Sequence, residues 1–523
     1  MREMNSIMEV ASTDVLVIGA GAAGVRAALA ASEAGANVLL VSKGELTQSG
    51  STFSTVSRGW GIQAVVGTER TEENLERFYN EIVSIGLGIC DPILVRILVE
   101  ESGPRLEDLL SYGMRFRKDS QGNILRAKGC FSEYERAFVA DDIRNIRSSF
   151  LSAIRRSSVR IVRGYAVELL REGNACWGAW IVGNANEIVR INAKSTVLAT
   201  GGGAGIFKDH LVSEMETGDG YALAWWAGAE LCNLEFIQLM LGSRRDGHRR
   251  FLPLAGLRKP HILCDSEGHD LLDLHIPNAH AREKAVRERQ RHFPFSSRDS
   301  SWTVDIAAAK TGKNGEKVFW RQNGVLEDQS EVVHFSHAFN GGIKIDEKGE
   351  SSVVGLFGAG EVAAGPHGAD RIGGCMMTAT QVFGMRAGRF AALRAKKIKT
   401  LPEIKETPEI FHGRKRSKDN MVILKNVIDS AKAIYKGSLM TLRHEKGLLH
   451  CLESIKNLEC ELDKAWWGNR SELIKYVEAK VILEVGKLVA RSALKRRSSL
   501  GGHFRIDSHY EPQNCLDHST PRP

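Results

Sequence analysis

Six residues near the start of the chain have types and spacing suited to holding a phosphate-bearing ligand. Gly19-Ala20-Gly21-Ala22-Ala23-Gly24 matches the pattern GxGxxG, directly after an apolar run and before an Ala-rich stretch. In such a turn the first glycine permits a sharp bend, the second lets a pyrophosphate approach the backbone, and the third lets helix and strand pack closely. The following helix N-terminus adds N–H donors and the positive end of its dipole. In this context the pattern predicts a dinucleotide site rather than a turn without a ligand.

The elements that must position this turn follow from the apolar pattern. Residues 15–18 predict a buried strand, 25–34 a helix, and 37–41 a second strand, which together make one βαβ unit of a parallel sheet. The second strand ends in Val41-Ser42-Lys43, without the acidic residue that binds the ribose in many NAD sites. Ser42 can still exchange a hydrogen bond with a ribose hydroxyl.

Two carboxylates lie in glycine-rich turns further along the chain. Asp219 stands in Thr217-Gly218-Asp219-Gly220, and Glu361 ends Gly358-Ala359-Gly360-Glu361. Either side chain could accept hydrogen bonds from ribose or ribityl hydroxyls, or could stabilise its own turn. A long dinucleotide would need contacts of this kind from distant segments.

The remaining periodicity divides the chain into regions. Residues 72–118 predict helices, with starts at Thr71 and at Asp91-Pro92, and residues 158–200 predict β-strands. Residues 235–335 are more polar and predict an insertion, whereas residues 420–497 have helical periodicity.

Composition excludes several classes of protein. The chain has 523 residues, 43% apolar and 26% charged, which is typical of a soluble protein of several domains. Its net charge of +8 fits an anionic cofactor or substrate, and no nucleic-acid-binding motif accompanies it. The nine cysteines form no CxxC pair, which argues against disulfide-reductase flavoproteins, metal sites and iron–sulfur sites, and suits a reducing compartment.

We expect no membrane segment near the start of the chain. The first nine residues are polar and too few for a signal peptide, and the apolar stretch 15–41 is broken by glycines, Arg26 and Glu33. Any membrane attachment would therefore come through a partner.

A further set of motifs extends along almost the whole chain. In order they are Ser49-Gly50-Ser51-Thr52, Gly59-Trp60-Gly61-Ile62, Ala199-Thr200-Gly201-Gly202-Gly203, Glu235-Phe236-Ile237-Gln238, His337 with Gly341-Gly342-Ile343, His367-Gly368-Ala369-Asp370-Arg371-Ile372-Gly373-Gly374, and Gly501-Gly502-His503-Phe504-Arg505-Ile506-Asp507. In this order and spacing, from about residue 12 to 507, the chain resembles the family of succinate dehydrogenase and fumarate reductase flavoproteins and L-aspartate oxidase. The resemblance implies FAD as cofactor.

The fold implied is α/β, with a Rossmann-like FAD-binding domain, an inserted capping domain and a C-terminal helical region. We expect the FAD-binding domain at 10–234 and 336–393, the capping domain at 235–335, and the helical region at 400–510. The capping domain would close over the flavin and exclude water.

Cofactor contacts are expected from the fingerprint, from the glycine-rich turns and from the resemblance, which implies that Glu361 binds the ribose or ribityl hydroxyls. The residues are Gly19, Gly21, Ala22, Ala23, Gly24, Ser42, Lys43, Ser49, Gly50, Ser51, Thr52, Gly61, Val167, Ala199, Thr200, Gly201, Gly202, Asp219, Gly360, Glu361, Met376 and Met377. Family members with covalently bound flavin carry a His in the segment matched by Ser51-Thr52. Residues 44–66 contain no His, so we expect FAD to be held noncovalently.

The resemblance also implies substrate residues. Arg371 and His337 would hold a substrate carboxylate, and Arg258 would give or take a proton while a hydride passes between flavin N5 and a substrate carbon. The chain departs from the family at two points of this site: Leu239-Met240-Leu241-Gly242 replaces His-Pro-Thr-Gly, and Cys375-Met376-Met377 replaces Asn-Ser-Leu. Phe131-Ser132-Glu133 stands where L-aspartate oxidases carry His-Ser.

These features predict an FAD-dependent oxidoreductase acting on a small carboxylic acid. Two alternatives stay open: an oxidase or dehydrogenase of another acid, such as an amino acid, and a noncatalytic subunit that relays electrons in a complex. The resemblance also implies a cytoplasmic location and an iron–sulfur partner subunit, with contact to the inner face of a membrane only through that partner.

Overall fold

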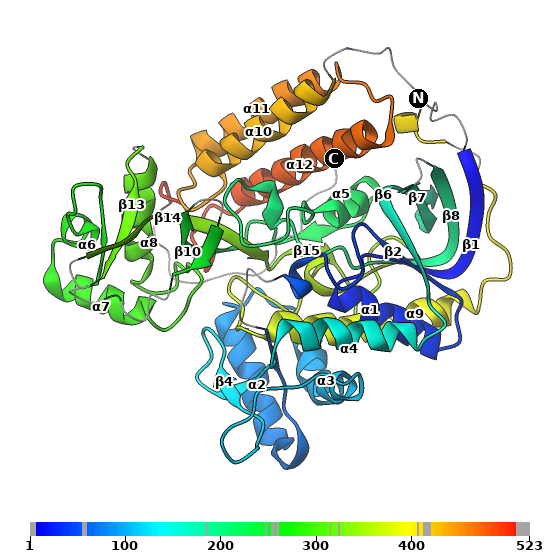
Figure 1. Ribbon diagram of the computed structural model, residues 1–523, viewed down its shortest axis with the longest axis horizontal. Coiled ribbons are helices and arrows are strands. Elements are labelled where there is room, and N and C mark those ends of the chain that lie inside the picture. The colour runs from blue at the N-terminus through cyan, green and yellow to red at the C-terminus, as the bar shows by residue number, and fades with distance from the viewer. Residues whose placement is uncertain are drawn as a thin grey trace.

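The structure is a computed structural model that describes residues 7–54, 60–184, 187–245, 248–252, 257, 261–313, 315–322, 325–404, 407–411 and 420–508. A six-stranded sheet, called the central sheet below, lies on the right in Figure 1. Its parallel part is ordered β6 (Arg160–Glu172), β2 (Val38–Ser42), β1 (Ile7–Ile18), β8 (Ile188–Leu198) and β16 (Leu356–Gly358). Strand β7 (Ala175–Gly183) pairs antiparallel with both β6 and β8.

The predicted strand–turn–helix–strand unit at the N-terminus is confirmed. Helix α1 (Ala22–Glu33) joins β1 to β2, and α9 (Cys375–Ala395) packs along it. Small residues make this packing close: a Cβ at Gly388 of α9 would lie 2.1 Å from the carbonyl oxygen of Ala27. A segment far along the chain is thus fixed beside the fingerprint turn.

A group of helices and a small sheet lies below α1 and α9 in Figure 1. It contains α2 (Glu72–Ile85), α3 (Pro92–Ser111), α4 (Ile143–Arg155), and strands β3 (Gly61–Gln63), β4 (Arg126–Lys128) and β5 (Glu135–Val139). The predicted helix starts are confirmed, since the side chains of Thr71 and Asp91 accept N-cap hydrogen bonds. The expectation that helix continues to residue 118 is wrong: α3 ends at Ser111, before Gly113, which has a φ of +90°.

The segment predicted as the capping domain, called the cap below, lies to the left in Figure 1 and contains a five-stranded sheet with helices. The strand order is β11 (His248–Phe251), β10 (Ile237–Arg245), β14 (Val325–Phe339), β13 (Val318–Gln322) and β12 (Ile262–Cys264). Helices α6 (Leu271–His275), α7 (Ala279–Arg289) and α8 (Trp302–Lys313) accompany the sheet. Strands β10 and β14 lead back to the central sheet. The boundaries 235–335 expected for the capping domain stay a prediction.

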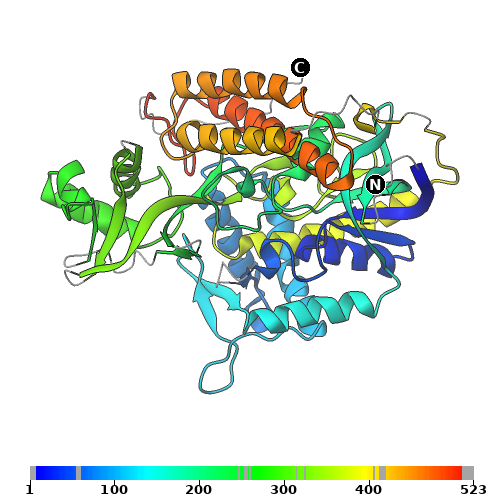
Figure 2. The same ribbon diagram turned by 45° about the horizontal axis from the view of Figure 1, so that its top comes forward.

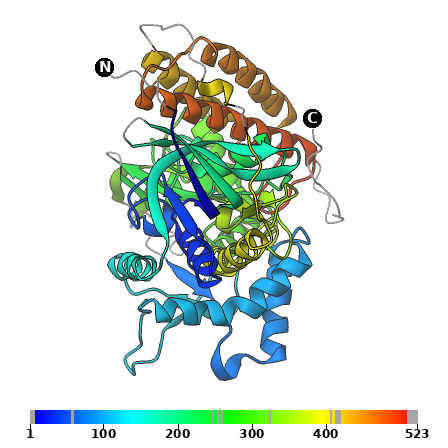
Figure 3. The same ribbon diagram turned by 90° about the vertical axis from the view of Figure 1, so that its right-hand side faces the viewer.

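Three C-terminal helices cover the side of the central sheet opposite to α1 and α9 (Figures 2 and 3). They are α10 (Asn420–Ser438), α11 (Glu445–Leu462) and α12 (Arg470–Lys495), and they confirm the helical periodicity of this region. Buried Arg443 and Arg496 bind the two ends of Glu235: the Arg443 guanidinium donates to its carbonyl oxygen at 2.7 Å, and Arg496 pairs with its carboxylate at 2.6 Å. This contact fixes the C-terminal region to the segment from which β10 begins.

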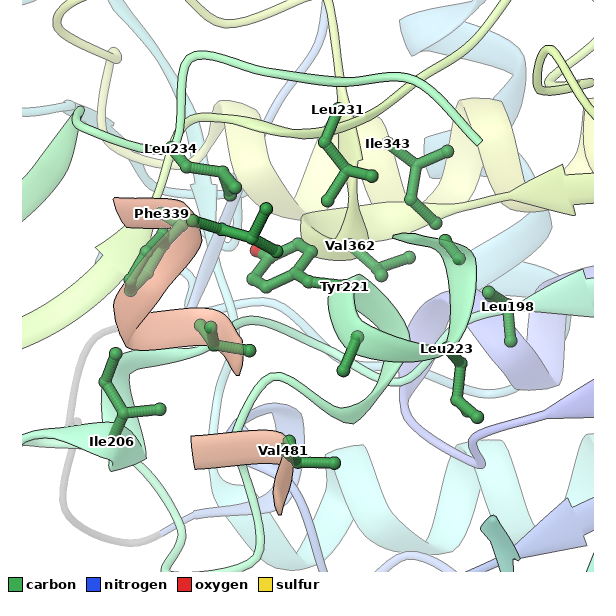
Figure 4. Packing of buried hydrophobic residues seen from close by; sticks show 14 of the residues in the cluster. Leu198, Ile206, Tyr221, Leu223, Leu231, Leu234, Phe339, Ile343, Val362 and Val481 are labelled. Carbon is green, nitrogen blue, oxygen red and sulfur yellow. The ribbon is translucent and has the colours of Figure 1, made fainter. Parts of the chain in front are cut away.

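The core beneath α12 supports the turn that carries Glu361 (Figure 4). Tyr221 of α5 (Asp219–Trp226) lies among Phe339, Ile343 and Val362. Ile343 belongs to the small sheet β9 (Leu231–Cys232), β15 (Gly342–Lys344) and β17 (Ala363–Ala364). The Tyr221 hydroxyl donates to the carbonyl oxygen of Glu361 at 3.1 Å. This hydrogen bond fixes the turn that carries Glu361 to the core.

Candidate active site

A cavity of about 870 Å³ lies where the fingerprint turn, the β4–β5 segment and the strands β10 and β14 meet. Most of the site residues predicted from the sequence line it. They are Gly19, Gly21, Ala22, Ala23, Ser42, Lys43, Ser49, Gly50, Ser51, Thr52, Gly61, Ala199, Thr200, Gly201, Asp219, His337, Glu361, Arg371, Met376 and Met377. We call the part formed by residues 19–24 and 49–52 the fingerprint end, and the part around Gln238, His337 and Arg371 the arginine end.

The glycines of the fingerprint have different roles. Gly19 has a φ of +108°, and a Cβ there would lie 2.3 Å from the carbonyl oxygen of Ala199. A Cβ at Gly24 would lie 1.8 Å from the carbonyl oxygen of Gly19. At Gly21, with a φ of −72°, the nearest atom to a Cβ would be the Thr52 hydroxyl oxygen at 3.6 Å. The protein itself therefore requires glycine at 19 and 24, whereas at Gly21 the requirement comes from whatever fills the cavity.

Four predicted cofactor residues do not line the cavity. Gly24, Gly202 and Gly360 lie behind its wall and allow close packing there: a Cβ at Gly202 would meet the Glu361 carboxylate at 1.9 Å, and one at Gly360 would meet the Ala23 side chain at 2.7 Å. Val167 is buried in the hydrophobic core, and its neighbours Tyr165 and Ala166 line the cavity instead. The cofactor contact expected of Val167 stays a prediction.

Asp219 lines the cavity and is already engaged by the protein. Its carboxylate accepts hydrogen bonds from the Tyr165 hydroxyl at 2.7 Å and the Thr217 hydroxyl at 3.1 Å, and it pairs with Lys43 at 2.9 Å. This geometry supports the alternative that Asp219 organises its own turn. It also fixes Lys43 at the end of β2, beside the fingerprint.

A buried carboxylate that sequence reasoning missed, Glu216, lies in the same cavity wall as Glu361. Glu216 accepts from the Ser51 hydroxyl at 2.5 Å and from the Gly202 N–H at 3.3 Å, while Glu361 accepts from the Phe339 N–H at 2.9 Å. Burial raises the pKa of Glu216, and burial together with the charge of Glu216 raises the pKa of Glu361. The only sequence signal was the position of Glu216, directly before the turn of Asp219.

The arginine end contains a buried guanidinium with unused hydrogen-bonding capacity. Arg371 is 8% exposed, and it donates to the Gln238 side chain and to the carbonyl oxygen of Ile372. Among the residues described, the Nε of Arg371 and the Nδ1 of His337 are buried and have no hydrogen-bond partner. Burial, and then the charge of Arg371, lower the pKa of His337 to about 4, so this imidazole is neutral at pH 7. A cation with a free donor beside a neutral imidazole is suited to a carboxylate.

Two further residues at this end had not been assigned a role from the sequence. Gln238 orients Arg371, and Met240, two residues further along β10, lines the cavity. Arg258, the predicted proton donor or acceptor, lies outside the described residues.

The observed site fits a flavin dinucleotide. The open space at Gly21, the N-terminus of α1 and the cavity volume suit a pyrophosphate and a large planar ring system. Within the described part of the chain, no group of three or more His, Cys, Asp or Glu side chains is arranged to hold a metal ion. In that same part, the helices are all too short or too polar to cross a membrane.

Comparison with known proteins agrees with this geometry. Residues 14–306 and 327–377 match the family described as FAD binding domain, and residues 428–520 match the fumarate reductase flavoprotein C-terminal family. The chain is 30% identical to one of the subunits of the fumarate reductase (CoM/CoB) of Methanothermobacter marburgensis, over 95% of both chains. It is 27% identical to the L-aspartate oxidase of Streptomyces coelicolor, over 95% of this chain and 89% of the relative.

Solved structures show the same fold. The Sdh1 complex of Mycobacterium smegmatis contains a chain that superimposes with a TM-score of 0.78 at 23% identity, covering 97% of this chain and 91% of that one. A chain of the E. coli quinol fumarate reductase gives a TM-score of 0.77 at 20% identity, with 98% and 94% covered. The chain therefore belongs to the family of FAD-dependent oxidoreductases that contains the flavoproteins of succinate dehydrogenase and fumarate reductase together with L-aspartate oxidase.

Proposed function

We propose that this protein transfers a hydride between noncovalently bound FAD and a small carboxylic acid. The observation that carries the proposal is the arginine end, where a buried guanidinium with a free Nε shares a cavity with the dinucleotide fingerprint. FAD, when bound, supplies the two-electron redox chemistry. The protein's own side chains bind the acid, orient it and exclude water.

Arg371 is proposed to hold the substrate carboxylate. Its hydrogen bond to Gln238 fixes the plane of the guanidinium and leaves Nε for the anion. Charge-assisted hydrogen bonds of this kind contribute about 1.5–3 kcal/mol each. Neutral His337 adds a second hydrogen bond to the carboxylate without adding a charge.

Arg258 stays the proposed proton donor or acceptor, on the strength of the family resemblance alone. An Arg can exchange a proton only where its surroundings stabilise the neutral form briefly, because its free pKa is above about 12.

Partner and location are also proposals. Relatives are named as subunits of fumarate reductases, which supports an iron–sulfur partner subunit that exchanges electrons with the flavin. We propose a cytoplasmic protein that reaches a membrane, if at all, through such a partner.

The test uses the purified holoenzyme without oxygen. The protein is reduced with a dye, carboxylic acids are added one at a time, and return of the oxidised flavin spectrum is followed. Return of the spectrum with at least one acid, and its loss in Arg371→Lys, is the expected result. A flavin that exchanges electrons with dyes but with no acid would instead favour the electron-relay subunit.

A further inference from the structure

An apolar wall stands beside Arg371 in the same cavity. Leu211, Met240 and Phe335 form a small buried cluster, with Phe251 packed against it. Of these, Leu211, Met240 and Phe251 line the cavity, and we call these three residues the apolar wall. The ring of Phe251 meets His337 edge-on, with 5.6 Å between ring centroids. The wall is therefore continuous with the residues proposed to bind the carboxylate.

The backbone sets the separation between the wall and Arg371. Gln238, which binds Arg371, and Met240 are two residues apart on β10, and both line the cavity. Two residues of a strand span about 7 Å. Cap residues Phe293 and Pro294 line the cavity too, and the N–H of the next residue, Phe295, donates to the carbonyl oxygen of Leu239 at 2.7 Å. A ligand extending from Arg371 would meet hydrocarbon at roughly this distance.

Among the described residues that line the cavity, none offers a second anion site near the wall. Among the described lining residues, the Lys and Arg side chains besides Arg371 are Lys43, which is paired with Asp219, and Arg117 and Lys128, which are exposed. His337 is neutral at pH 7 because burial lowers its pKa. A second carboxylate against Met240 and Phe251 would lose its hydration without gaining a partner among these described residues, which is strongly unfavourable.

We propose that the acid substrate is a monocarboxylate, whose single carboxylate binds Arg371 and whose apolar group lies against the wall of Leu211, Met240 and Phe251. This inference rests on the proposed function and narrows it from small carboxylic acids in general to those with a hydrocarbon end. Each methylene buried against the wall strengthens binding about fourfold, until the space is filled.

Binding to the oxidised holoenzyme, read from changes in the flavin spectrum without turnover, tests the proposal. Butanoate and succinate form a matched pair, since a methyl group in one stands where the other has a second carboxylate. We expect butanoate to bind at least tenfold more tightly than succinate, and affinity to rise from butanoate to pentanoate and hexanoate. Succinate binding as tightly as butanoate, or more tightly, would overturn the monocarboxylate assignment while leaving the proposed function intact. If no acid changes the spectrum and none is turned over, the proposed function itself fails.

Variants of the wall residues test whether the hydrocarbon end of the ligand binds there. Met240→Lys places an ammonium group at the wall and is expected to reverse the preference, with succinate binding more tightly than butanoate. Met421→Lys, at an exposed position of α10, is the control and should leave both affinities unchanged. If Met240→Lys does not bind FAD, Phe251→Ala replaces it and should weaken hexanoate at least tenfold with little change for succinate. An unchanged hexanoate affinity in a folded, FAD-bound Phe251→Ala protein would place the hydrocarbon elsewhere and refute the proposal.

Discussion

The two ends of the cavity are built in different ways. At the fingerprint end the glycines of one short segment create the site, and two of the three are required by contacts within the protein itself. At the arginine end the side chains of Gln238, His337 and Arg371 come from three segments separated along the chain, and atoms of two of them have no partner among the residues described. One end is therefore fixed by backbone geometry and the other by side chains, which single substitutions can replace one at a time.

The largest effect is expected from Gly21→Val at the fingerprint end. The backbone there accepts a side chain, and a Cβ would have no protein atom closer than 3.6 Å, so the fold should persist while FAD binding is abolished. Circular dichroism and the flavin absorbance of the purified variant provide the measurement. Gly312→Val, in open space on α8, should keep its flavin. A Gly21→Val protein with a full flavin content would show that the dinucleotide lies elsewhere.

The second prediction is that the fingerprint end holds FAD without a covalent bond. Acid precipitation of the holoenzyme should release all of the yellow colour into the supernatant. Colour that stays in the protein pellet would contradict this, and digestion followed by mass spectrometry would then identify the attached residue.

At the arginine end, Arg371→Lys should keep FAD and lose activity. Lys cannot reproduce the planar, two-pronged contact of Arg with a carboxylate. We therefore expect kcat/KM to fall about 30- to 1,000-fold, which corresponds to a loss of roughly 2–4 kcal/mol of transition-state stabilisation. Arg389→Lys, at an exposed position of the helix α9 that follows Arg371 in the chain, serves as control. Unchanged kcat/KM would move the substrate carboxylate away from Arg371, and loss of flavin would make Arg371 a structural residue.

The smallest effect is expected from Glu216→Gln, in the cavity wall beside Ser51. Since burial raises the pKa of Glu216 above that of the unfolded chain, its contribution to stability is greatest in acid and falls as the pH rises. Gln keeps partners for Ser51 and Gly202 but does not titrate. The melting temperature of the FAD-free variant should therefore exceed that of the wild type by roughly 1–2 °C at pH 8, with a smaller difference at pH 5.5.

Calorimetry at the two pH values measures this difference. Glu107→Gln, at an exposed position of α3, should show no such pH dependence. An equal effect of Glu216→Gln at both pH values would mean that Glu216 is ionised throughout.

The fold, and a set of residues most of which line the cavity, could be predicted from the sequence, because both depend on local patterns. The strand, turn and helix around Gly21 follow from periodicity and glycine spacing, and are confirmed. Glu216 was missed because a single Glu before a turn has no pattern of its own. Which of the neighbouring residues 165–167 line the cavity could not be predicted either, because it depends on what each face of the strand packs against. The contact of Gln238 with Arg371 joins residues 133 positions apart, which no local pattern encodes.

The position of α9 beside α1 has a consequence for the order of events during synthesis. Glu361 and the helix that packs on the fingerprint leave the ribosome only after the whole cap, so the fingerprint end stays incomplete until then. At about 5–20 residues per second this interval is on the order of tens of seconds. We expect stalled nascent chains exposed only to residue 340 to bind no FAD, whereas chains exposed beyond residue 500 should bind it. FAD binding during synthesis would therefore indicate that the cap and the central sheet have both been made and have come together.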